Sequence, residues 1–246
     1  MLRDSRPDAP SFLAPDAPLA VLTRGYLTAL LDGDQHQAST LILDAVATGV
    51  PITDIYLYVF QPAQYEVGRL WETHDISVAQ AHYCTAATQV VMSKLYPHIF
   101  AVAGQDGTLV ATCVAGDLHE IGVRMVADFF EMDGWDTHYL GANTPVADVV
   151  TAVIDRKADV LAISVTISAY LPEVSALIKA VRARTAAPLP FSWVVVLSTR
   201  RQACGSKWVP TAQRPTPRQP SSWPTGSGAG GLRRDGPCPP GRRVAV

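Results

Sequence analysis

Asp117 and His119, separated by one residue, are the pair of side chains in this sequence best suited to metal chemistry. The Asp117 carboxylate can reach one nitrogen of the His119 imidazole, which fixes the ring tautomer and leaves the other nitrogen available to coordinate a metal. Gly122 follows at a position where the missing side chain lets a bulky ligand approach the backbone. Taken alone, Asp-x-His-x-x-Gly also suits a hydrogen-bonded histidine in an ordinary loop.

The elements around this motif predict where it lies. The apolar, β-branched run Thr108–Val114 precedes it and predicts a strand. Further strands are expected at Trp135–Leu140, Val160–Val165 and Phe191–Leu197, alternating with helices at Glu120–Met132, Val146–Arg156 and Pro172–Arg184. This alternation favours an α/β fold, a doubly wound, flavodoxin-like parallel sheet covered on both faces. Open sheets of this kind bind ligands at the carboxyl ends of their strands, where His119 is expected.

Residues 18–100 show helical rather than strand periodicity. Tyr26, Leu27, Leu30 and Leu31 repeat at helical spacing, and Asp32-Gly33-Asp34 ends that helix and caps the next. A second helix ends near Gly49, a third begins at Pro51, and a fourth runs from near Asp75 or Ser77 to Leu95, before Pro97. Four helices with short connections predict a small bundle.

A second motif follows the Asp117-to-Gly122 motif at a defined distance. Residues 123–163, which are 41 positions, separate Gly122 from Ser164-Val165-Thr166. This pattern resembles the cobalamin-binding domain family of methionine synthase, corrinoid methyl carriers and cobalamin-dependent regulators, in which Ser-x-Leu follows at about that distance; here Thr166 replaces the leucine. The resemblance implies methylcobalamin or adenosylcobalamin bound base-off, with His119 as the lower axial cobalt ligand and Asp117 as its partner. It also implies that Gly122, Ser164 and Thr166 contact the cofactor, Ser164 through the nucleotide tail.

The helical segment carries its own resemblance. Regulatory members of the family, including light-sensing ones, have a tryptophan followed after nine residues by Glu-His; here Trp71 is followed after nine residues by Ala81-His82. The resemblance implies a four-helix cap in which Trp71 shields the upper axial group and His82 contacts that group or the opened cobalt. The alternatives are that Trp71 belongs to the bundle core and that His82 is a packed or exposed helix residue.

The C-terminal part of the chain departs from the family pattern. A Gly-Gly pair is expected near residues 193–199, which contain no glycine. Residues 198–246 carry nine basic side chains and one acidic side chain. Because the full chain has 20 basic and 22 acidic side chains, residues 1–197 carry 11 basic and 21 acidic ones. This Pro- and Arg-rich tail is predicted to be disordered. We hypothesise that the reading frame shifts near residue 190.

These patterns predict a domain organisation. A disordered N-terminus covers 1–17, a helical cap domain 18–100, a truncated cobalamin-binding α/β domain 105–197 and a disordered tail 198–246. No apolar run has the length of a membrane span, no signal peptide is apparent, and the four cysteines form no CxxC pair. A cytoplasmic protein without a membrane or direct nucleic-acid partner is therefore expected.

Three functions remain open at this point. The first is a cobalamin-dependent regulatory or sensor module that acts on a signalling partner. The second is a corrinoid methyl carrier serving partner methyltransferases, with no independent catalytic site. The third is a truncated remnant that no longer binds the cofactor.

Overall fold

The computed structural model describes residues 12–14, 16–99 and 107–184, together with the backbone of 193–197. The predictions for residues 1–11 and for the tail 198–246 lie outside the described residues. Phe12, which the sequence assigns to the disordered N-terminus, contacts the helical part: its amide donates to Glu66 Oε2 at 2.9 Å, and its ring lies 5.3 Å from that of Tyr65.

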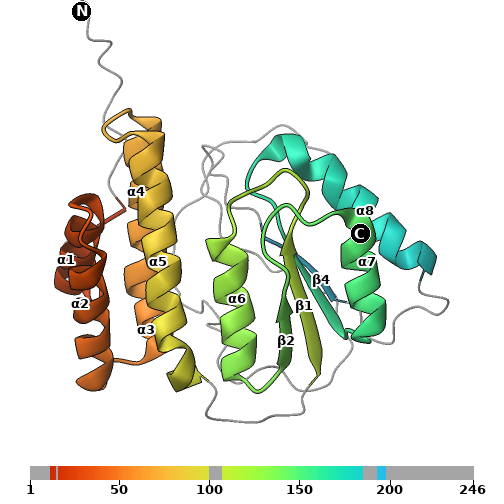
Figure 1. Cartoon of the computed structure of the whole chain (residues 1–246), viewed down its shortest axis with the longest axis horizontal. Coiled ribbons are helices and arrows are strands. Elements are labelled where there is room, and N and C mark those ends of the chain that lie inside the picture. Colours follow the sequence, from red (N-terminus) through yellow and green to blue (C-terminus); the bar gives the residue numbers. More distant parts are fainter. Residues whose placement is uncertain (1–11, 15, 100–106, 185–192, 198–246) are drawn as a thin grey trace, which may run out of the picture. The chain divides into compact units, whose positions relative to one another are not determined.

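The helical part contains the four predicted helices (Figure 1). They are α1 (Ala20–Leu31), α2 (Gln35–Ala47), a continuous helix made of α3 (Ile52–Ile55), η1 (Tyr56–Phe60) and α4 (Gln61–Glu72), and α5 (Val78–Ile99). The predicted cap between the first two is confirmed, since Asp34 Oδ1 accepts a hydrogen bond from the Gln37 amide at 2.8 Å. Tyr26, Tyr56 and Phe60 are fully buried in the core of this part.

Two features of these helices differ from the prediction. The segment η1 is π-helical rather than α-helical, and the hydroxyl of Thr23 on α1 donates to its Tyr58 carbonyl at 2.7 Å. Helix α5 continues past Pro97 to Ile99 instead of ending at Leu95. Pro97 lies in the last turn, where its missing N–H removes one helical bond, while Leu95 and Ile99 remain buried in the core.

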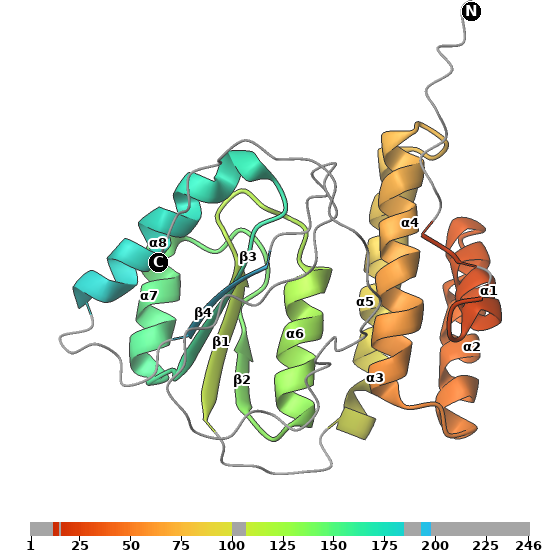
Figure 2. The same ribbon diagram turned by 180° about the vertical axis from the view of Figure 1, so that it is seen from behind.

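The second part is a parallel sheet with helices on both faces. Its strands are β1 (Thr108–Cys113), β2 (Asp136–Tyr139), β3 (Val160–Ser164) and β4 (Trp193–Leu197), in the order β2-β1-β3-β4. Helix α6 (Ile121–Met132) covers one face, and α7 (Val146–Asp155) and α8 (Leu171–Arg184) cover the other (Figures 1 and 2). A short 3₁₀ turn, η2 (Ser168–Tyr170), precedes α8. The predicted doubly wound, flavodoxin-like fold with a helical cap is confirmed.

Helix α6 is buried on two sides. Ile121 and Met125 belong to the core of the helical part, and Phe129 packs against it. Val123, Ala127 and Phe130 are also buried, and the helix lies against β1 and β2. Helix α6 therefore has two apolar faces, one packed against the helical part and the other covering the sheet.

No helix in the described ranges is both long and apolar enough to cross a membrane.

Candidate functional site

The Asp117–His119 pair lies in the loop between β1 and α6, at the carboxyl end of the strand. Asp117 is fully buried, and its Oδ1 lies 2.8 Å from His119 Nδ1 and accepts from the His119 amide at 3.0 Å. Its other oxygen, Oδ2, accepts from the Thr166 amide at 2.5 Å. The His119 side chain is 55% exposed, and within the described part of the chain its Nε2 forms no hydrogen bond. The ring is therefore fixed on one side and open on the other.

The two groups shift each other's pKa toward the charged pair. Burial acts to raise the pKa of Asp117, but hydrogen bonds from the His119 ring and from the Thr166 and His119 amides outweigh it, so that pKa lies below its ordinary value. The hydrogen bond with Asp117 raises the pKa of His119 against a smaller opposing effect of burial. When the imidazole is neutral, the carboxylate favours the tautomer with hydrogen on Nδ1, which leaves the Nε2 lone pair for a metal.

Neighbouring loops hold the peptide before Asp117. The Gly116 amide donates to Asn143 Oδ1 at 2.8 Å, and Gly116 has a φ of 86°. A Cβ at this position would lie 3.1 Å from the ring of Tyr170, so glycine is required both for the backbone and for space. The positioning roles of Asn143 and Tyr170 do not follow from the sequence, because they depend on three loops meeting at one edge of the sheet.

The surroundings of the exposed imidazole fit a large, partly apolar ligand. Gly122 is exposed, and no atom would lie within 4 Å of a Cβ built on it, so the chain itself gives no reason for a glycine there. Leu118 is 66% exposed and Ile167 42% exposed, next to His119 and Thr166 respectively. An open glycine and exposed aliphatic side chains beside a free ring nitrogen suit a macrocycle that carries its own metal.

The second motif lies behind this loop. Ser164 pairs in register with Cys113 at the end of β1, and its hydroxyl is hydrogen-bonded to the Cys113 thiol. Burial raises the pKa of Cys113 to about 12, so the thiol stays neutral, and it donates to the His119 carbonyl at 3.6 Å. Thr166 contributes its amide to Asp117 and is half-buried. The structure therefore brings Ser164 and Thr166 to the Asp117–His119 loop, with Ser164 itself buried.

The predicted cap residues lie at the junction of α4 and α5. Trp71 is 44% exposed, so the alternative that it belongs to the bundle core is wrong. His82 is an exposed residue of α5. Within the described residues neither side chain is hydrogen-bonded to the Asp117–His119 loop.

The register between α5 and α6 shows where His82 lies along the helix. Three hydrogen bonds join α5 to α6: Gln89–Glu120 at 2.6 Å, Ser93–Arg124 at 2.9 Å and Tyr96–Glu131 at 3.0 Å. The residue numbers increase together along both helices, so the two helices run parallel. The first eleven residues of α5, 78–88, therefore extend beyond the start of α6 by roughly 16 Å. His82 precedes Gln89 by two turns and shares its face. That face continues past the level of the His119 loop.

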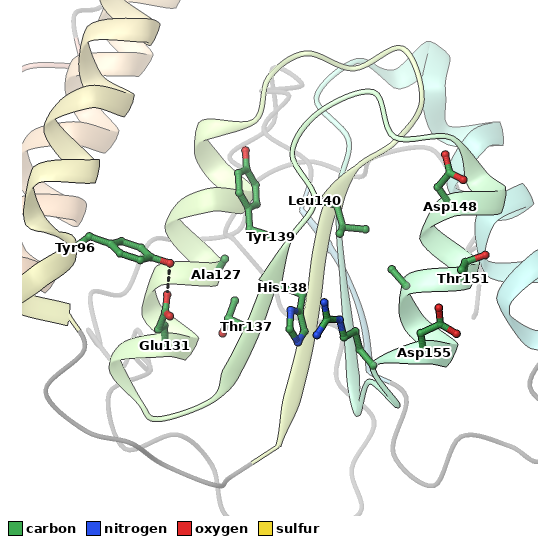
Figure 3. A pocket seen from close by; sticks show the side chains of 12 residues that line it. Tyr96, Ala127, Glu131, Thr137, His138, Tyr139, Leu140, Asp148, Thr151 and Asp155 are labelled. Carbon is green, nitrogen blue, oxygen red and sulfur yellow. Dashed lines mark hydrogen bonds between the residues drawn. The ribbon is translucent and has the colours of Figure 1, made fainter.

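A cavity of about 610 Å³ lies away from His119, beside the edge strand β2 (Figure 3). Its walls come from α5, α6, β2 and α7, and the Tyr96–Glu131 hydrogen bond lies on its α6 side. No pattern in the sequence predicts this cavity.

Comparison with known proteins identifies the family. Residues 107–191 match the family model described as B12 binding domain, and residues 22–96 match a second model with the same description. The chain belongs to the B12-binding domain family. Both models are described by B12 binding. One covers most of the helical part, and the other covers the second part from β1 to α8.

Relatives of this chain include a transcriptional repressor and several corrinoid proteins. It is 30% identical to the HTH-type transcriptional repressor CarA of Myxococcus xanthus over 115 residues, which are 47% of this chain and 39% of the repressor. It is 24% identical to trimethylamine corrinoid protein 1 of Methanosarcina mazei over 139 residues, 55% of this chain and 64% of that protein. The chain thus spans between about two fifths and two thirds of these relatives' lengths.

Among solved structures, the monomethylamine corrinoid protein of Methanosarcina barkeri has the same fold. The TM-score is 0.65 at 19% identity, and the match covers 74% of this chain and 86% of the other.

Proposed function

We propose that this chain binds methylcobalamin or adenosylcobalamin in the base-off form, with His119 as the lower axial ligand, and acts as a cobalamin-dependent regulatory module. The observation that carries the proposal is the half-exposed imidazole of His119, oriented by the buried Asp117 carboxylate at the carboxyl end of β1. A ring fixed in this way offers its Nε2 to a metal at little further entropic cost.

Each neighbouring residue has a role in this proposal. Asp117 fixes the His119 tautomer, Gly122 leaves room for the corrin, and Leu118 and Ile167 contact its apolar parts. Ser164 and Thr166 bind the nucleotide tail, and because Ser164 is buried in the described structure, its hydroxyl must become accessible when the tail binds.

The regulatory role rests on the first turns of α5. Bound cobalamin supplies a cobalt–carbon bond whose loss or exchange changes the group on the upper face of the corrin. Trp71 and His82 are exposed, and His82 lies on the face of α5 that extends past the His119 loop. In this proposal Trp71 covers the upper group and His82 responds to its loss, which alters the association with a protein partner. The 30% identity with a transcriptional repressor supports this role.

A second candidate is a corrinoid methyl carrier that serves a partner methyltransferase. The matches to methylamine corrinoid proteins over about half of this chain favour it. The third possibility, a remnant that binds no corrinoid, is decided by the same experiment.

The experiment is a titration of the purified chain with methylcobalamin and adenosylcobalamin in the dark, followed by absorbance before and after illumination. We expect a base-off/His-on spectrum that is lost in His119→Ala and kept in His138→Ala. His138 is the matched control because it also pairs with an aspartate, Asp136, at 3.2 Å. Illumination that changes the oligomeric state supports the regulator, and methyl transfer to a thiol or folate acceptor supports the carrier. A spectrum in which the vitamin keeps its own benzimidazole on the metal, or absence of bound corrinoid, refutes the proposal.

A further inference from the structure

Glu120, the residue directly after His119, uses both carboxylate oxygens in contacts that the proposed function does not employ. Its Oε1 accepts from Gln89 Nε2 at 2.6 Å, and its Oε2 accepts from the Tyr139 hydroxyl at 2.8 Å. Glu120 is the N-cap residue of α6, yet its side chain forms no capping bond. The carboxylate therefore connects neighbouring elements instead of accepting a hydrogen bond from a backbone amide at the start of α6.

The two donors come from different parts of the chain. Gln89 lies on α5 in the helical part, and Tyr139 is the last residue of β2 in the sheet. Burial, with Glu120 adding to it, raises the pKa of Tyr139 well above its usual range, so the phenol stays protonated and remains a donor. Gly141 lies beside this carboxylate, since a Cβ built on it would be in ordinary van der Waals contact with Glu120 Oε2, at 3.4 Å.

The hydrogen bond between Gln89 and Glu120 also lies closer to His119 than the other bonds that join the helical part to α6 in the described ranges. The Ser93–Arg124 bond follows one turn further along α6, and the Tyr56–Asp128 and Tyr96–Glu131 bonds lie two to three turns further. Among these hydrogen bonds, the one to Glu120 is therefore the nearest link between α5 and the His119 loop.

We infer that Glu120 is a positioning residue that couples the His119 loop to helix α5. Asp117 fixes the His119 imidazole from the side of the sheet. Glu120 fixes the backbone directly after His119 from the side of the helical part, through its hydrogen bond with Gln89. The inference rests on the proposed function: corrinoid binding at His119 and docking of α5 stabilise each other through this carboxylate. The two equilibria are linked reciprocally. If bound corrinoid strengthens the docking of α5 by some factor, undocking of α5 weakens the affinity for corrinoid by the same factor.

The test compares wild type with Glu120→Ala, Gln89→Ala and the exchanged pair Gln89→Glu/Glu120→Gln. In the exchanged pair the amide introduced at position 120 donates to the carboxylate introduced at position 89, and its amide oxygen still accepts from Tyr139. Glu131→Ala is the matched control, because Glu131 also accepts a tyrosine hydroxyl between α5 and α6, but far from His119. The readouts are amide hydrogen exchange of residues 78–92 in the protein without cofactor, the Kd for methylcobalamin, and the His-on absorbance band.

We expect Glu120→Ala and Gln89→Ala each to speed exchange in the first half of α5 and to weaken methylcobalamin binding about tenfold. Glu120→Ala also reduces the His-on band at saturation, and the exchanged pair recovers all three readouts. In wild type, added methylcobalamin slows the exchange of α5, and in Glu120→Ala it does not.

Three results would overturn the inference. One is a Glu120→Ala protein with wild-type affinity, band and exchange. Another is a Glu131→Ala protein that loses affinity and band as strongly as Glu120→Ala, which would make Glu120 merely structural. The third is an exchanged pair no better than Gln89→Ala. If wild type binds no corrinoid, the proposed function fails, and exchange in the cofactor-free proteins still decides whether Glu120 holds α5.

Discussion

At the scale of single residues, the chemistry of the site depends on a buried carboxylate that has three donors. Asp117 receives hydrogen bonds from the ring and amide of His119 and from the amide of Thr166. A buried carboxylate is costly unless it is fully paired, and these bonds join the first motif of the sequence to the second. The loop after β1 and the loop after β3 are therefore positioned by one side chain.

Replacing Asp117 by asparagine should weaken cobalamin binding by about 10- to 100-fold, because the imidazole loses the charged partner that orients it. An asparagine also presents an N–H group toward one of the two amide donors. The measurement is a titration followed by absorbance, with Asp136→Asn as the control, since Asp136 also pairs with a histidine but its carboxylate is exposed. Equal Kd values for Asp117→Asn and wild type would contradict the orienting role.

Two substitutions of Gly122 test folding stability and cobalamin binding independently. Gly122→Ala should raise the free energy of unfolding of the cofactor-free protein by about 0.5–1 kcal/mol, because glycine is a poor helix former and the site is open. Gly122→Leu should fold equally well and yet bind cobalamin at least tenfold more weakly, because its side chain occupies the space proposed for the corrin. Chemical denaturation and titration measure the two effects.

Ala183→Leu is the control for Gly122→Leu, since Ala183 is an exposed residue near the end of α8. Unchanged affinity in Gly122→Leu would show that the corrin does not approach α6.

At the scale of elements, the contact between η1 and α6 contains a buried acid. The Tyr56 hydroxyl donates to Asp128 Oδ2 at 2.7 Å, and burial raises the pKa of Asp128 to about 6. The Tyr56 hydrogen bond and nearby Arg124 oppose the rise, and Glu131 adds to it. The folded protein therefore binds a proton at Asp128 more tightly than the unfolded chain does.

The sign of the pH dependence follows from this raised pKa. The contribution of Asp128 to stability is fully present below the unfolded pKa of 3.8 and is lost as pH rises through about 6. Asp128→Asn should therefore gain about 2 kcal/mol relative to wild type between about pH 4 and pH 7.5. Urea denaturation across this range measures it, with the exposed Asp155→Asn as control. A pH-independent difference between Asp128→Asn and wild type would contradict the buried acid.

The sequence predicted most of the elements because apolar periodicity and capping residues are local. The strand β1, the helix α6 and the Asp34 cap all follow from neighbours within a few residues. The π-helical turn at η1 could not be predicted, because Thr23 satisfies the Tyr58 carbonyl from another helix. The Asp117–His119 contact was likewise predictable over two residues, whereas the Glu120–Gln89 contact depends on how two distant helices pack.

At the scale of the whole molecule, charge is divided unevenly along the chain. The full sequence contains 20 basic and 22 acidic side chains. Residues 1–197 contain 11 of the basic and 21 of the acidic side chains, and residues 198–246 contain the rest. All residues proposed to contact the cofactor precede Leu171. The proposed binding function therefore does not draw on the basic tail.

A chain ending at Leu197 should bind cobalamin with a Kd within about twofold of the full chain. Its formal net charge changes from −2 to about −10, so it should be retained more strongly on an anion exchanger. Absorbance titration of the two chains, matched for ionic strength, measures the affinity. A tenfold loss would assign the tail a part in binding.

The exposure of Trp71 also has an optical consequence. An indole that is 44% accessible emits at long wavelength, and in our proposal a strongly absorbing ring system settles against it. Filling the site should therefore dim and blue-shift the contribution of Trp71, one of the chain's five tryptophans, to the protein fluorescence. Loading could then be followed at nanomolar protein, in real time and without any label.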